Sequence, residues 1–227
     1  MRHPAGIHKL ALAALIATSL LVVIAGSFWA TRLIALRRAQ TTTPTQAANS
    51  ALLGFPMKGD LAPDFNLVDQ FGHPVALSSL RGHEVVLAFI DSRCTSICPL
   101  TANIMYDAKA QLGASAASRV TLVAVNANPT ATSIAAVQAW SINHGMLHQW
   151  LFLTGSAQQL QSVYHSYGVY VQVDSSGNDV HDPSMYIIDA QGHERLLFET
   201  LNSNSKPDLS SEESGLVIGM RQWLPQS

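Results

Sequence analysis

The longest uninterrupted apolar stretch of the chain lies near its N-terminus. No charged residue occurs between Lys9 and Arg32, and the 22 positions from Leu10 to Thr31 are mostly Leu, Ala, Ile and Val. A helix of this length spans about 33 Å, enough to cross a hydrocarbon core of about 30 Å. Trp29 lies near one end, where amphipathic aromatic side chains favour the membrane interface. The pattern predicts a single transmembrane helix that anchors the protein.

A cleaved signal peptide is the alternative interpretation of this stretch. The apolar region of a signal peptide is shorter, and no convincing small-x-small cleavage motif precedes Arg32, so an anchor is favoured. The flanking charges leave the orientation undecided, because Arg2 and Lys9 lie on one side and Arg32, Arg37 and Arg38 on the other.

Residues 39–58 have little apolar periodicity and few charges, and they are rich in Thr, Gln and Ala. This composition is typical of a flexible tether. The sequence therefore predicts three parts: an anchor with its flanks over 1–38, a tether over 39–58 and one compact domain over 59–227.

Within the domain, strand-like and helix-like patterns alternate. Two continuous apolar runs of strand length, 85–90 and 120–125, are typical of buried parallel strands. Hairpins are predicted about the turns at 69–74 and 189–192, and a short strand at 151–153. Helices are predicted over 99–112, 133–144, 156–167 and 212–223. This order predicts an α/β fold, a thioredoxin-like mixed sheet flanked by helices, with an added N-terminal hairpin.

The helix predicted over 133–144 should turn Ile134, Val137 and Ile142 toward the core. At the end of this predicted helix and just beyond it lie His144, Met146 and His148, which could form a secondary copper-loading site. Gly145 interrupts the helix that would align these side chains, so separate roles are favoured.

The chain carries few charges of either sign. It has 13 Lys and Arg against 15 Asp and Glu, a net charge of −2, and charged residues make up 12 % of the sequence. The near-neutral balance argues against nucleic acid as a partner, and the 48 % of hydrophobic residues argues against disorder.

The two cysteines of the chain, Cys94 and Cys98, follow the apolar run 85–90 and open the next helix. Residues four apart on a helix share a face, so modest local adjustment would let the pair form a disulfide or hold one metal ion. A helix N-terminus also favours the thiolate, which attacks disulfides and binds soft metals. The alternative is a pair of inert core thiols or a structural disulfide.

Three segments of the domain resemble the Sco/SenC family. They are the Ala-Pro-Asp-Phe-containing stretch 62–72, Leu80-Arg-Gly82, and Cys94-x-x-x-Cys98-Pro99 after a buried strand. The resemblance covers about residues 60–200. It implies a membrane-tethered, thioredoxin-like copper protein that serves assembly of the dinuclear copper site of cytochrome c oxidase.

The resemblance also implies a third copper ligand. In the family this is a histidine eight residues before the end of a Tyr-aliphatic-aliphatic strand, and here Tyr186-Ile-Ile-Asp189 places it at His181. The chain departs from the family in having Thr95 and Ser96 between the cysteines, where Pro-Asp is usual. All three implied ligands, Cys94, Cys98 and His181, are nevertheless present.

Two thiolates and an imidazole form a soft donor set suited to Cu(I), and able to hold Cu(II) with an added ligand. The implied partners are the copper-bearing subunit of the oxidase and another copper chaperone or a thioredoxin-like reductant. With the predicted anchor, this indicates a single-pass protein of a bacterial inner membrane whose soluble domain lies on the periplasmic side.

Three other functions remain open at this level. Cys94 and Cys98 could instead be the redox-active pair of a cell-envelope thiol–disulfide oxidoreductase acting on partner cysteines. The spacing Thr95-x-x-Cys98 is that of a peroxiredoxin-like peroxidase, although the Pro-rich loop that normally precedes it is missing. A plain binding module with a structural disulfide is the third. Asp91 and Arg93 would either tune the thiols electrostatically or lie in solvent.

Overall fold

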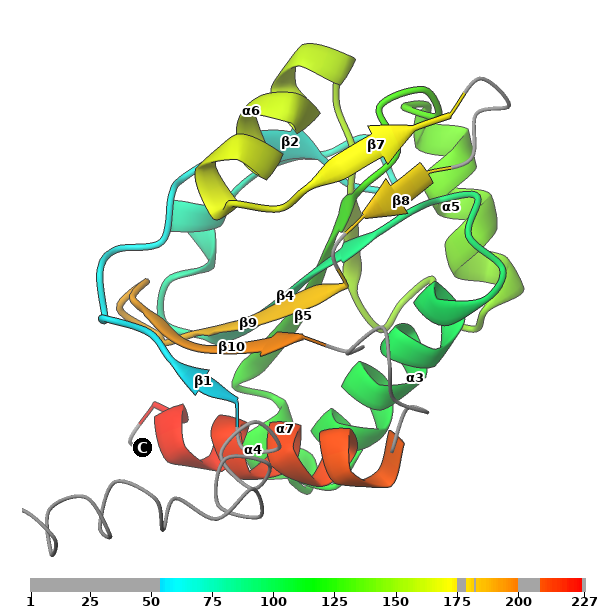
Figure 1. Ribbon diagram of the computed structural model, residues 1–227. Coiled ribbons are helices and arrows are strands. Elements are labelled where there is room, and N and C mark those ends of the chain that lie inside the picture. Colours follow the sequence, from blue (N-terminus) through cyan, green and yellow to red (C-terminus); the bar gives the residue numbers. More distant parts are fainter. Residues whose placement is uncertain (1–53, 175–178, 182, 200–208, 226–227) are drawn as a thin grey trace, which may run out of the picture. The chain divides into compact units, whose positions relative to one another are not determined.

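The computed structural model describes residues 54–174, 179–181, 183–199 and 209–225 (Figure 1). The predicted anchor, and the predicted tether up to residue 53, lie outside these residues. Within them, none of the helices combines the length and the apolar character needed to cross a membrane.

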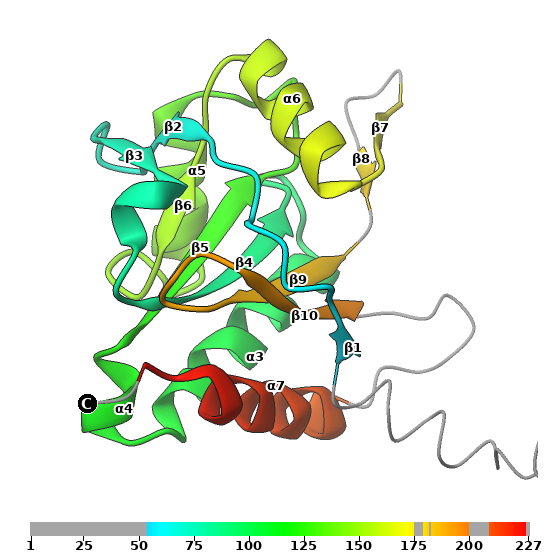
Figure 2. The same ribbon diagram turned by 90° about the vertical axis from the view of Figure 1, so that its left-hand side faces the viewer.

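A six-stranded mixed sheet forms the centre of the domain (Figures 1 and 2). Its strands, in spatial order, are β1 (Phe55–Pro56), β10 (Glu194–Glu199), β9 (Ser184–Ile188), β4 (Glu84–Ile90), β5 (Val120–Asn126) and β6 (Leu151–Leu153). β4, β5 and β6 run parallel to one another, whereas β9 is antiparallel to β4 and β10 is antiparallel to β9. The predicted mixed sheet is therefore confirmed.

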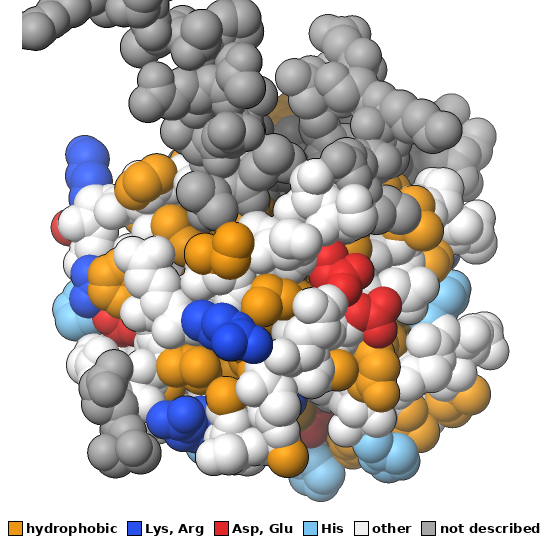
Figure 3. Space-filling model, turned by 90° about the horizontal axis from the view of Figure 1, so that it is seen from below, with side chains coloured by type: hydrophobic (Ala, Val, Ile, Leu, Met, Phe, Trp, Pro, Cys, Tyr) orange, Lys and Arg blue, Asp and Glu red, His pale blue; other side chains and the backbone are white. Residues whose placement is uncertain are grey.

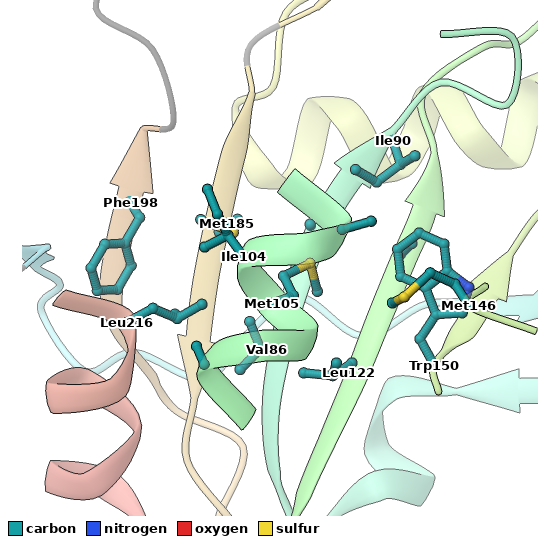
Figure 4. Close-up of a cluster of buried hydrophobic side chains, with 14 of the residues drawn as sticks. Val86, Ile90, Ile104, Met105, Leu122, Met146, Trp150, Met185, Phe198 and Leu216 are labelled. Atoms are coloured by element: carbon teal, nitrogen blue, oxygen red, sulfur yellow. The ribbon is translucent and has the colours of Figure 1, made fainter. Parts of the chain in front are cut away.

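Both faces of the sheet are covered, which explains the unbroken apolar runs of its central strands. On one face the core is completed by α3 (Ile97–Ala110), α5 (Ile134–Asn143) and α7 (Leu209–Trp223), as Figure 4 shows in part. On the other it is completed by α6 (Ala157–Tyr167), the 3-10 turn Leu77–Leu80, and the hairpin of β2 (Asn66–Val68) and β3 (Pro74–Ala76). Alternate residues of β4 enter the two cores, because side chains of a strand point to opposite faces.

Three smaller elements complete the described part of the chain. The one-turn helix α4 (Ala114–Ala117) follows α3, and β7 (Val171–Val173) pairs with β8 (Asp179–His181) in a separate two-stranded sheet. Neither α4 nor the pairing of β7 with β8 was predicted from the sequence. Neither short strand contains the continuous apolar run by which β4 and β5 were recognised.

The inward face of α5 differs from the predicted one. Val137 is buried as expected, but the side chains of Ile134 and Ile142 are 39 % and 56 % exposed. Trp140 and Ser141 are buried instead, three and four residues after Val137. The spacing of one helical face decides burial here, and Ser141 is accommodated because its hydroxyl donates to the carbonyl of Val137.

The sheet begins earlier than the composition indicated. Phe55 and Pro56, at the end of the predicted tether, pair with Leu197 and Leu196 of β10. The backbone N–H of Met57 then donates to the carbonyl of Arg195 at 2.9 Å. Strand pairing with β10 fixes these residues, although their own sequence has no strand-like alternation.

Charged side chains are sparse on the surface of the described part. On the face seen in Figure 3, Lys and Arg do not gather into one basic patch.

A buried carboxyl group lies at the start of β4. Glu84 has an exposed fraction of 0 %, and neither of its carboxyl oxygens has a hydrogen-bond partner among the residues that the structure describes. Loss of solvation, and secondarily the negative charge of Asp189, raise the pKa of Glu84 to about 9. The side chain is therefore protonated at neutral pH.

We expect this carboxyl group to make the domain less stable as the pH rises. The unfolded chain loses the proton near the ordinary pKa of 4.5 whereas the folded protein keeps it to about 9, so the stabilisation present below pH 4.5 is lost across that window. The slope is at most about 1.4 kcal/mol per pH unit. Glu84→Gln should remove it, which is measured by urea unfolding at pH 5 to 8.

Asp107→Asn, which changes an exposed carboxyl group to an amide on α3, is the matched control. Its unfolding free energy should follow the pH dependence of the wild type. Parallel curves for the wild type and Glu84→Gln would show that Glu84 is ionised in the folded protein.

Candidate functional site

The candidate site starts where β4 leaves the sheet. Asp91 and Ser92 are buried directly after the strand, whereas Arg93 is exposed. The backbone N–H of Arg93 donates to Oδ1 of Asp91 at 2.8 Å, and that of Cys94 donates to the carbonyl of Asp91 at 3.1 Å. Of the two residues considered as electrostatic tuners, Asp91 thus lies inside the turn and Arg93 in solvent.

The two cysteines lie on either side of the start of α3. The helix begins at Ile97, so Cys94 belongs to the loop and Cys98 to the first helical turn. Cys94 is half-buried and Cys98 is 1 % exposed; both are free thiols. The backbone N–H of Cys98 donates to Sγ of Cys94 at 3.4 Å. The pair meets as predicted, but through this helix-capping contact rather than on one helical face.

The two thiols have opposite electrostatic environments. A hydrogen bond from the Cys98 thiol, and backbone N–H groups of Cys98 and Ser96, lower the pKa of Cys94 to about 4, against the effect of its burial. Donation to Cys94, burial, and the charges of Cys94 and Asp91 raise the pKa of Cys98. At neutral pH the half-exposed sulfur is therefore the thiolate and the buried sulfur holds the proton.

A buried amide holds the loop to the neighbouring strand. Asn126, the last residue of β5, accepts hydrogen bonds at Oδ1 from the backbone N–H of Ser92 at 3.3 Å and of Asn128 at 3.2 Å. Its Nδ2 donates to the carbonyl of Ala131 at 2.8 Å. Asn126 was not predicted from the sequence, because one asparagine at a strand end carries no motif.

Trp140 of α5 was not predicted either; its indole Nε1–H donates to the backbone carbonyl of Cys94 at 3.0 Å. The two residues are 46 positions apart, and no local pattern relates them. The one feature of the sequence that could have indicated a buried Trp140 is its spacing, three residues after the inward-facing Val137.

His181, the third implied ligand, lies in β8 at the end of the sheet where β4 finishes. Its Nε2 is 3.1 Å from the carbonyl oxygen of Phe89. Since a carbonyl only accepts, Nε2 carries the proton in this contact. In the part of the chain that the structure describes, no three His, Cys, Asp or Glu side chains are grouped closely enough to hold a metal ion. The structure thus brings Cys94 and Cys98 together and places His181 in contact with the strand that leads to them.

The secondary loading site considered for His144, Met146 and His148 is not assembled. His144 stacks on Trp140 at 3.9 Å between ring centroids, and His148 stacks on Phe71 at 5.7 Å. Met146 is buried in the hydrophobic core. The three side chains have different surroundings, as the interruption at Gly145 indicated.

A mixed sheet flanked by helices, with a thiol pair at the start of the helix that follows its central strand, defines a thioredoxin-like protein. The model of the SCO1/SenC family matches residues 56–209, about two thirds of the sequence, and the chain belongs to this family.

Solved structures of the family have the same fold. Copper-bound ScoI of Arabidopsis thaliana is 23 % identical, with 72 % of this chain and 100 % of that chain covered and a TM-score of 0.61. Apo Sco1 of Thermus thermophilus is 23 % identical, with 76 % and 96 % covered and a TM-score of 0.62. Copper-bound Sco1 of yeast is 19 % identical, with 73 % and 91 % covered and a TM-score of 0.59. A search of curated protein sequences gave no match.

The unequal thiols lead to a reactivity prediction. Because Cys94 is a thiolate above about pH 4, its alkylation by iodoacetamide should proceed at a nearly constant rate from pH 6 to 8. An ordinary thiol, with a pKa of about 8.5, would react nearly tenfold faster with each pH unit in this range. Cys98 should react far more slowly, which peptide mass spectrometry distinguishes.

Two variants test the cause of this reactivity. Cys98→Ser keeps a hydrogen-bond donor beside Cys94, so the flat pH profile should persist. Cys98→Ala removes the donor and should raise the pKa of Cys94, so that alkylation near neutral pH becomes pH-dependent. Identical profiles for the two variants would exclude the Cys98 side chain as the donor.

Proposed function

We propose that this protein binds copper through Cys94, Cys98 and His181. We propose further that it delivers copper to, or prepares the cysteines of, the dinuclear copper site of cytochrome c oxidase. The observation that carries the proposal is the pair of reduced thiols in contact at the start of α3, one of them a thiolate, in a SCO1/SenC domain. The proposal is also supported by structures of related Sco proteins with copper bound.

The chemistry of the donors fits copper. Thiolate sulfur is the ligand that Cu(I) prefers, and two sulfurs satisfy its low coordination number. Cu(II) favours nitrogen donors and more ligands, which gives His181 its role. Cys98 must lose its proton to become a ligand, so copper binding should release protons to solvent.

The partners follow from the same proposal. The copper-bearing subunit of the oxidase is the acceptor, and another copper chaperone or a thioredoxin-like reductant supplies copper or electrons. BsSco, a similar member of the Sco family of cytochrome c oxidase assembly proteins, has a disulfide switch, which supports both the oxidase partner and the redox coupling.

Copper titration of the reduced protein tests the ligand set. The wild type should bind one copper ion, with a thiolate charge-transfer band for Cu(II). His181→Ala should weaken Cu(II) binding by at least about tenfold, or 1.4 kcal/mol, and Cu(I) binding much less. We expect the variant to fold, because loss of the hydrogen bond to the Phe89 carbonyl costs only about 1 kcal/mol.

His165→Ala is the matched control, because His165 is exposed on α6 and belongs to no proposed ligand set. It should bind copper like the wild type. Equal Cu(II) affinity and equal spectra for His181→Ala and the wild type would remove His181 from the site.

Thiol–disulfide exchange is the second candidate function, favoured by the difference between the two sulfurs. The Cys94 thiolate would attack a partner disulfide, forming a mixed disulfide and expelling one partner thiolate. Cys98, after losing its proton, would attack Sγ of Cys94 and release the partner as a dithiol, with two electrons transferred from the pair. This function does not need His181, so unchanged exchange and unimpaired copper binding in His181→Ala would favour it.

We propose a membrane-anchored location, supported by the uncharged stretch 10–31 and by the length of the segment that follows it. The domain would face the periplasm from a bacterial inner membrane. Protease added to intact spheroplasts should then digest the domain, whereas protection of the domain would contradict this orientation. A mature soluble chain lacking the first 31 residues would identify the stretch as a signal peptide.

A further inference from the structure

We infer that Trp140 is a positioning residue for the thiol of Cys94. The inference rests on the proposed thiol and copper chemistry of the pair and names a residue outside the implied ligand set. Its basis is the hydrogen bond from the indole Nε1–H to the backbone carbonyl of Cys94, at 3.0 Å. This bond joins α5 to the loop between β4 and α3.

The hydrogen bond from Trp140 holds the backbone carbonyl of Cys94, and a second hydrogen bond holds its backbone N–H. The N–H of Cys94 donates to the carbonyl of Asp91, which ties the residue to the end of β4. The carbonyl of Cys94 accepts the indole Nε1–H of Trp140, which ties the same residue to α5. With both groups fixed, the peptide planes on each side of Cys94 are oriented, and with them Sγ, which accepts the N–H of Cys98.

Trp140 is itself held rigidly, so it can act as an anchor. Its indole stacks on Trp150 at 5.5 Å between centroids and meets the ring of Phe152 edge-on at 5.7 Å. The ring of His144 stacks on it at 3.9 Å, and Nδ1 of His144 lies 2.8 Å from the carbonyl of Trp140. Figure 4 shows Trp150 and Met146 in the buried cluster that continues from this group.

The position of Cys94 matters for the balance between thiols and disulfide. The N–H of Cys98 stabilises the thiolate of the reduced pair, and this stabilisation is lost when Sγ becomes part of a disulfide. Loosening the loop should therefore favour the disulfide and slow the attack of Cys94 on an electrophile. Because a single neutral hydrogen bond is removed, the expected change in either quantity is about threefold to tenfold.

The chain offers a matched pair of variants. Trp140 and Trp150 are each 4 % exposed and belong to the same aromatic group, and the Nε1–H of each makes one hydrogen bond. That of Trp150 goes to the Ser141 hydroxyl, away from the cysteines. Trp140→Phe and Trp150→Phe therefore remove the same chemical groups, and only one of the changes removes a contact with Cys94.

The measurements are the equilibrium of the Cys94–Cys98 pair with reduced and oxidised glutathione, and the rate of Cys94 alkylation, both on the full chain. Trp140→Phe should shift the equilibrium toward the disulfide and slow alkylation, while Trp150→Phe should match the wild type in both. Equal effects of the two variants, or none in Trp140→Phe, would overturn the inference.

If circular dichroism shows that Trp140→Phe does not fold, a second pair decides. His144→Ala removes the ring stacked on Trp140, and His148→Ala removes the ring stacked on Phe71. Only His144→Ala should shift the glutathione equilibrium, and equal equilibria in these two variants would overturn the inference.

Failure of this inference is distinguishable from failure of the proposed function. A wild type that binds no copper would contradict the function, yet the thiol measurements would still compare Trp140 with Trp150. A wild type that binds copper, with both tryptophan variants behaving alike, would contradict only the role of Trp140.

Discussion

The parallel pairing of β4 with β5 is the interaction on which the candidate site depends. Parallel strands end at the same edge of a sheet, and here the ladder runs from Glu84 and Val120 to Ile90 and Asn126. It continues one step further, since the N–H of Ala127 donates to the carbonyl of Ile90 at 2.9 Å. The loop that carries the thiols therefore starts from a fixed point in the interior of the protein. Asn126 then supplies the polar partner that the buried loop backbone needs.

The two ends of β4 show how partners decide the state of a buried ionisable group. Glu84, at the start of the strand, receives no hydrogen bond at its carboxyl oxygens from the described part of the chain, and it keeps its proton. Cys94, beyond the end of the strand, accepts hydrogen bonds from Cys98 and Ser96 and loses its proton. Burial opposes the charged form at both places, and only donors aimed at the atom reverse its effect. The sheet thus carries a neutral acid at one end and a thiolate at the other.

The sequence predicted those features that depend on local pattern. The apolar runs gave β4 and β5, and Ser156 with Gln159 forms a capping box at the start of the helix expected there. The predicted inward face of α5 was wrong at Ile142, because helical spacing places this residue on the side away from Val137, Trp140 and Ser141. Ile134, the first residue of the helix, is also partly exposed. In the candidate site, too, local pattern predicted some residues and not others. The cysteine spacing was visible, and His181 emerged from a family resemblance, whereas Asn126 and Trp140 act through contacts made only after folding. Such partners cannot be recognised from local sequence, because nothing near them in the chain distinguishes them from any other buried asparagine or tryptophan.

Under the proposed function, the structure also says what copper binding must change. Cys98 donates its thiol proton to Cys94, and His181 holds the carbonyl of Phe89 through Nε2. A copper site that includes Cys98 and His181 requires the Cys98 thiol to lose its proton. It also requires the His181 side chain to move toward the two sulfurs. The free energy of binding is reduced by these changes, and the loss is smaller the better Cys94 is already in place. Cys94 is held from both β4 and α5, whereas Cys98 must yield a proton and His181 lies on a separate hairpin. Under the proposed function, this combination of one fixed ligand and two adjustable ones suits a protein that must release its metal as well as bind it.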